Sequence, residues 1–115
     1  MRLLFAAIVA ATALGGCSSA PPAGFARLTL NNPYWTKVNV QLVVTRSSDC
    51  DNRGEGFIDI RELVMPRNQL EIIDVPNGAN LCWRRDRNPD KPEDGVWTGW
   101  TKAILPPGRS QEANL

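Results

Sequence analysis

The chain has 115 residues, and its 13 Lys and Arg residues nearly balance its 12 Asp and Glu residues, which leaves a formal net charge of +1. This length suits one small domain. The balanced charge argues against a nucleic-acid partner, because neutralising phosphates requires a clear basic excess, and it gives no support for a general attraction to anionic lipid. The sequence has no His, no phosphate-binding glycine loop and no metal-ligand pattern, so we expect neither catalysis nor a cofactor.

Residues 1–16 have the pattern of a secretory signal peptide. Arg2 supplies the positive start, and the apolar run 3–14 has a length of about 12 residues, within the roughly 7 to 15 of a signal core. This run is too short to span a bilayer, which needs about 20 apolar residues. Gly15 and Gly16 follow it and leave room for a peptidase to approach the backbone.

The residues Leu14, Gly15, Gly16 and Cys17 resemble the lipobox of bacterial lipoproteins. The resemblance implies cleavage after Gly16 by signal peptidase II and attachment of diacylglycerol and an N-acyl chain to Cys17, which tethers a protein to a membrane without spanning it. Ser18 resembles the sorting pattern of enteric lipoproteins held in the outer membrane and facing the periplasm. The alternative is a plain signal peptide, which leaves Cys17 as an odd third cysteine in an oxidising compartment.

Residues 17–24 are expected to form a lipidated N-terminus and a flexible tether. The seven residues after Cys17 reach at most about 25 Å when extended, so the domain is expected close to its membrane. Residues 25–106 then form the predicted β domain, because polar and apolar residues alternate with period two and turn residues separate the runs. The tail over 107–115 is predicted to be disordered.

The expected strands are short and no apolar stripe of helical period and length occurs. The expected strands cover 25–30, 37–45, 57–60, 69–75, 81–85 and 96–105. Residues 61–65 either continue the strand at 57–60 or bend away from it. This pattern predicts an all-β fold, a small antiparallel sandwich or barrel-like domain. The immunoglobulin pattern does not fit, since it places its buried Trp between the two cysteines and Trp83 follows the second one.

Cys50 and Cys82 are an even pair in an exported chain, which predicts one disulfide that closes a loop of about 33 residues. A catalytic thiol is the alternative, but the sequence offers no His as its base. Asp49, Asp51 and Gly54 resemble the start of a calcium loop. Arg53 and Ile60 then stand where that loop requires oxygen ligands, so a solvated loop fits better and no metal site is predicted.

Large aromatic residues are unusually dense near the last predicted strand. Trp83 shares a face with Leu81 and is predicted to lie in the core. Trp97 and Trp100 are three residues apart, which places them on opposite faces of a regular strand unless Gly99 marks a bulge. They either fill the core and an edge or form an exposed platform for a glycan or a peptide.

Arg84, Arg85 and Arg87 form a local basic cluster beside four acidic residues, Asp86, Asp90, Glu93 and Asp94. One interpretation is a loop whose opposite charges compensate each other. The other is a guanidinium patch that binds carboxylates of a partner or of peptidoglycan stems. Adjacency in a strand points Arg84 away from Trp83, so a joint Trp and Arg site does not follow from spacing alone.

The sequence therefore predicts a lipid-anchored protein of the cell envelope that binds or supports something without catalysis. Its partner is expected to be another envelope protein, engaged through a sheet edge or through the aromatic residues. The alternative is a glycan or peptidoglycan binder that uses Trp97 or Trp100 with Arg84 or Arg85.

Overall fold

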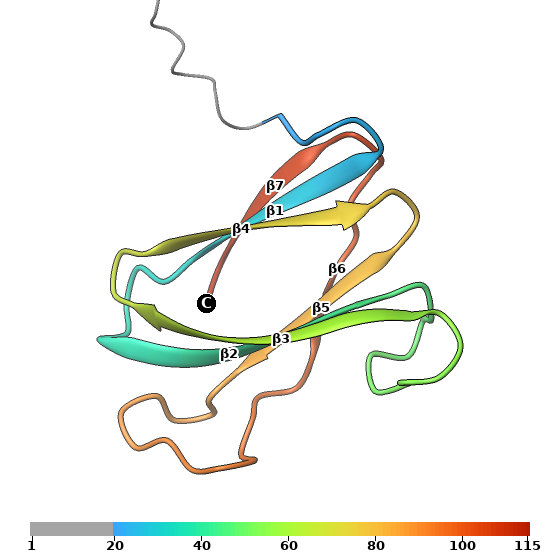
Figure 1. Ribbon diagram of the computed structural model, residues 1–115. Coiled ribbons are helices and arrows are strands. Elements are labelled where there is room, and N and C mark those ends of the chain that lie inside the picture. The colour runs from blue at the N-terminus through green and yellow to red at the C-terminus, as the bar shows by residue number, and fades with distance from the viewer. Residues whose placement is uncertain (1–19) are drawn as a thin grey trace, which may run out of the picture.

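The computed structural model describes residues 20–115, which form seven strands (Figure 1). The predicted signal peptide over 1–16 and Cys17 lie outside the described residues. The strands are β1 (Phe25–Asn31), β2 (Lys37–Thr45), β3 (Phe57–Pro66), β4 (Leu70–Pro76), β5 (Asn80–Arg85), β6 (Thr101–Ala103) and β7 (Ser110–Asn114). Among residues 20–115 no helix is long and apolar enough to cross a membrane.

The strands form two sheets that face each other, as Figure 1 shows. One sheet has the order β4-β1-β7, and the other has the order β3-β2-β5-β6. The all-β sandwich predicted from the alternation is confirmed. Each sheet buries one apolar face against the other, which is the stable solution for two amphipathic sheets.

The alternation of β2 decides which residues enter the core. Val38, Val40 and Leu42 are at most 1% exposed and pack against β1, β4 and β5 residues between the sheets. The next residues along the strand, Gln41 and Val43 among them, point to the outer face of the four-stranded sheet. Trp83 is 9% exposed and belongs to the same core as Leu81, as predicted.

Asn32, at the turn after β1, is fully buried, and both polar atoms of its side chain form hydrogen bonds. Its Nδ2 donates to the carbonyl oxygens of Trp35 at 2.8 Å and Met65 at 2.9 Å, and its Oδ1 accepts from the Trp35 amide at 2.9 Å. The Asn32 amide also donates to the Gln69 carbonyl at 3.2 Å. Asn32 therefore ties the β1–β2 turn to the turn between β3 and β4.

The exposed face of the three-stranded sheet carries the one ion pair found among residues 20–115. Arg27 Nε lies 2.8 Å from Asp74 Oδ1, and the two residues are directly opposite each other in β1 and β4. The hydrogen bond that Arg27 donates to Asp74 raises the pKa of Arg27 above its ordinary value. Arg27 is charged across the physiological pH range with or without this hydrogen bond. The pair therefore fixes the register of β1 against β4 and adds little pH dependence to the stability of the fold.

Three expectations about the chain need correction. The disordered tail predicted over 107–115 is wrong for 110–114, since β7 pairs in parallel with β1 and Leu115 donates its amide to Asn31. The sheet is therefore not wholly antiparallel. The last strand predicted over 96–105 shrinks to β6, whereas the expected continuation of the strand 57–60 through 61–65 is confirmed, since β3 runs to Pro66. β7 is polar apart from Ala113, so backbone pairing to a central strand forms it, and this leaves no hydrophobic pattern to detect.

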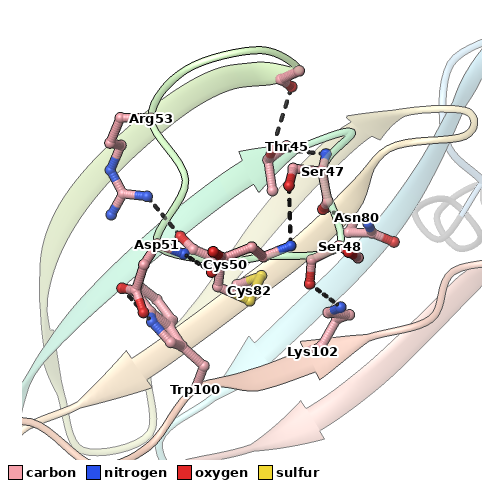
Figure 2. The surroundings of a disulfide bond; sticks show 12 residues. Thr45, Ser47, Ser48, Cys50, Asp51, Arg53, Asn80, Cys82, Trp100 and Lys102 are labelled. Atoms are coloured by element: carbon pink, nitrogen blue, oxygen red, sulfur yellow. Dashed lines mark hydrogen bonds between the residues drawn. A yellow bond between two sulfur atoms is a disulfide. The ribbon is translucent and has the colours of Figure 1, made fainter.

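The Cys50–Cys82 disulfide predicted from the cysteine count is confirmed (Figure 2). It does not bridge the two sheets. Cys82 lies in β5, and Cys50 lies in the loop that follows β2, so the bond holds this loop on the outer face of the four-stranded sheet. Beneath it Val43 is fully buried, and Phe57 and Trp100 pack against the same small apolar cluster. The bond thus creates a second, separate core.

Further contacts hold the disulfide loop in place (Figure 2). Arg53 Nη1 donates to the Cys50 carbonyl at 2.6 Å, Lys102 Nζ to the Ser48 carbonyl at 2.6 Å, and Trp100 Nε1 to Asp51 Oδ1 at 2.9 Å. Asp49 Oδ1 accepts from the Asp51 amide at 2.9 Å, so both calcium-like aspartates take part in hydrogen bonds that hold the loop. Residues 20–115 contain no group of three or more acidic, His or Cys side chains suited to a metal ion.

Removing the disulfide is expected to destabilise the domain. In the chain-entropy model a loop of about 33 residues contributes roughly 3 to 4 kcal/mol, and here the loop also covers Val43. The double variant Cys50→Ala, Cys82→Ala should lower the free energy of unfolding by about that amount in urea titrations. Addition of reductant to the variant serves as the control, because it should change nothing further. Equal stability of wild type and variant would contradict a stabilising bond.

Candidate ligand site beside Trp97

The outer face of the four-stranded sheet brings together three of the residues predicted as contacts. Arg84 projects from β5, with its guanidinium carbon 4.1 Å from the ring centroid of Trp100 and 5.3 Å from that of Trp97. Its Nε donates to Gln41 Oε1 at 2.8 Å, and Gln41 Nε2 donates to Glu62 Oε2 at 3.2 Å. A continuous polar and aromatic network therefore crosses β5, β2 and β3.

Trp97 and Trp100 reach the same guanidinium because residues 96–100 do not continue a regular strand. Trp97 forms only an isolated bridge with Asp86, and the Thr98 amide donates to the Arg85 carbonyl at 2.8 Å. The period of two is lost here, so the expected placement on opposite faces does not hold. A joint Trp and Arg cluster exists although spacing alone did not predict it.

The two indole rings have different environments. Trp100 is tied down on several sides: its N–H donates to Asp51, its ring packs on the disulfide cluster, and Arg84 lies against it. Trp97 also contacts Arg84, but it lines an open cleft. Trp100 therefore supports the structure, and Trp97 is the aromatic side chain placed to meet a ligand.

Arg85 is separated from this cluster. Its guanidinium lies 5.1 Å from the ring centroid of Trp35, and its Nη1 donates to the Asp86 carbonyl at 2.6 Å. Neighbours along a strand point to opposite faces, so Arg84 and Arg85 cannot form one patch. The predicted pair of guanidinium groups is thus divided between the two sides of the sheet.

The cleft beside Trp97 has a volume of about 250 Å³ and lies between the outer face at β2 and β3 and the loop 87–95. Its walls contain four carboxylates, one indole and no Lys or Arg side chain. The lining residues of main interest are Asn39, Glu62, Asp86, Glu93, Asp94 and Trp97.

Within residues 20–115 none of these four carboxylates forms an ion pair. Asp86, which is 5% exposed, accepts hydrogen bonds through Oδ2 from the Asn39 amide at 2.9 Å and from Asn39 Nδ2 at 2.8 Å. Glu62 accepts from the neutral Gln41 amide. The cleft therefore presents hydrogen-bond acceptors and negative charge, and no cation within residues 20–115 forms an ion pair with its carboxylates.

The interpretation of a self-compensated charged loop fails because the nearby arginines are used elsewhere. Arg84 stacks on the indoles, Arg85 lies on Trp35, and Arg87 Nη2 donates to the Trp97 carbonyl at 3.2 Å. Sequence reasoning also missed Glu62 and Asn39 as cleft residues. Their only signal was their outward position in alternating strands, which becomes informative only once the order β3-β2-β5 is known.

Chemically, the cleft can accept hydrogen bonds from a ligand, attract a positive charge and offer an aromatic surface. Comparisons of the chain with protein-family models, with curated proteins and with solved structures find no match. The class that the fold defines is a small disulfide-bonded β-sandwich, and a fold of this class does not by itself imply a function.

Replacing Arg84 is expected to loosen both indoles. The variant Arg84→Met keeps the apolar stem but removes two cation–π contacts, which should cost about 1 to 2 kcal/mol of unfolding free energy. In fluorine NMR of fluorotryptophan-labelled protein, the Trp97 and Trp100 signals should move while the Trp35 and Trp83 signals stay. Arg46→Met is the matched control, since the Arg46 guanidinium donates to the Asn77 carbonyl, away from both indoles. Unmoved Trp97 and Trp100 signals would show that the stack does not position them.

Proposed function

We propose that the protein is a lipid-anchored, non-catalytic binding module of the cell envelope, facing the periplasm, that engages another envelope protein at the cleft beside Trp97. The observation that carries the ligand site is the unneutralised acidic cleft with an indole wall. Carboxylates and an aromatic ring together suit a Lys or Arg side chain of a partner, because they supply both a countercharge and a cation–π surface.

The anchor rests on the resemblance of residues 14–17 to a lipobox. The disulfide fits the same compartment, since such bonds persist in an oxidising envelope. Two or three acyl chains hold a protein firmly to a membrane, so the module needs no spanning segment. Outer-membrane sorting follows from Ser18 under the enteric pattern.

A glycan, such as a peptidoglycan strand, is the second candidate ligand. Trp97 can stack on a sugar ring, and the carboxylates Glu62, Glu93 and Asp94 can accept hydrogen bonds from hydroxyl groups. A neutral sugar makes less use of four negative charges than a basic side chain does. The two candidates differ in salt dependence, because binding of a cation weakens as salt screens the charges.

The lipid anchor is tested at Cys17. In Cys17→Ala we expect loss of radioactive fatty-acid labelling and of signal cleavage, because the modified thiol is gone. The double variant Cys50→Ala, Cys82→Ala is the control, and it should keep its label because neither residue takes part in lipidation. Retained label in Cys17→Ala would exclude the anchor.

The ligand site is tested by Trp97→Ala. Loss of a central Trp at an interface commonly costs about 2 kcal/mol or more, which is roughly a 30-fold weaker affinity. We expect recovery of the envelope partner in crosslinking and co-purification to fall accordingly, while circular dichroism stays native. Tyr34→Ala is the control, since this residue is 68% exposed and outside the cleft.

A charge-matched pair of variants separates the cleft from general electrostatics. Glu93→Gln with Asp94→Asn should weaken binding, whereas Glu55→Gln with Asp90→Asn makes the same change of charge outside the cleft and should not. Retention by purified peptidoglycan that Trp97→Ala abolishes would favour the glycan instead. Unchanged binding of folded Trp97→Ala to both classes of ligand would exclude this site.

A further inference from the structure

One end of the sandwich gathers the segments 20–25, 77–79 and 104–109, next to the point where the chain enters β1 (Figure 1). Hydrogen bonds join these segments to one another and to β1. The Asn77 amide donates to the Gly24 carbonyl at 2.9 Å, the Gly108 amide to Asn77 Oδ1 at 3.2 Å, and the Arg27 amide to the Arg109 carbonyl at 2.9 Å. The end is therefore one assembled surface, called here the entry end.

The entry end is apolar and carries no carboxylate within its three segments. Ile104 is 79% exposed, the highest value among the exposed large hydrophobic residues of the described chain, and Pro106 and Pro107 beside it are also exposed. Arg109 is the only charged residue of the three segments, and Arg46 reaches toward them with Nη1 3.3 Å from the Asn77 carbonyl. An exposed Ile on a surface that also carries two cations matches the lipid interface, where apolar groups meet anionic headgroups.

We propose that the entry end contacts the membrane, with Ile104 entering the interface and Arg46 and Arg109 lying near lipid phosphates. This inference rests on the proposed lipid anchor. Three residue steps separate Cys17 from Ala20, so their Cα atoms lie at most about 11 Å apart. A lipidated Cys17 therefore holds the entry end against the bilayer, where high local concentration makes weak contacts effective.

The contact fixes an orientation that a tether alone does not. The cleft lies among residues at the other end of the sheet, where β5 ends and β6 has not begun. With the entry end on the membrane, the cleft faces away from it, toward the periplasm. Of the other exposed apolar residues, Ile60 and Ile72 lie along β3 and β4 away from the entry end, and Val64 lines the cleft.

The experiment uses the full lipidated chain reconstituted in vesicles of phosphatidylcholine and phosphatidylglycerol with brominated acyl chains. Ile104→Trp introduces an indole at the entry end, and Ile72→Trp introduces one on the side as the matched control. We expect the vesicles to quench the emission added by Ile104→Trp about twofold and to leave that added by Ile72→Trp unchanged. Adding Arg46→Gln and Arg109→Gln should reduce the quenching, and omission of phosphatidylglycerol should do the same.

Flotation of the wild type with the vesicles separates the two possible failures. A chain that does not float lacks the anchor, which would overturn the proposed function itself. A chain that floats while Ile104→Trp is quenched no more than Ile72→Trp keeps the anchor but overturns the membrane contact. Loss of an envelope protein partner from Ile104→Asp in the absence of vesicles would assign this surface to a protein and would also overturn it.

Discussion

The disulfide between Cys50 and Cys82 is the constraint on which the arrangement of the outer face depends. It holds the loop after β2 over Val43 and so creates an apolar cluster outside the sandwich. Trp100 packs on this cluster and donates to Asp51 in the same loop, and Arg84 lies between Trp100 and Trp97. The position of the Trp97 indole in the cleft is thus connected to a covalent bond through three successive contacts.

Strand alternation in the sequence predicted the strands that carry an apolar face, and it placed Trp83 and Leu81 correctly in the core. The even cysteine pair likewise predicted the disulfide. β7 could not be predicted in this way, because a polar strand is formed by backbone pairing with β1 and side-chain periodicity does not report that. Its parallel direction is a property of the topology, which no local pattern contains.

The site was harder to predict than the fold, for a related reason. Trp97, Trp100 and Arg84 were each recognisable, but their convergence depends on the irregular segment 96–100 and on the neighbours of β5 in the sheet. The acidic residues of the cleft come from β3, from Asp86 just after β5, and from the loop 87–95. Residues that assemble from separate elements can be identified by type in a sequence, whereas the distances between them cannot.

The use of the arginines gives the strongest argument that the cleft is for binding. A carboxylate that loses solvent without a cationic partner lowers stability, and Asp86 is only 5% exposed, so a domain shaped by stability alone would pair it with a nearby cation. Arg84 and Arg85 are close in sequence to Asp86, yet their guanidinium groups contact indole rings instead, and no ion pair with the cleft carboxylates forms within residues 20–115. The charge is left available at a surface that also presents Trp97, which is the arrangement that a partner with a basic group can complete.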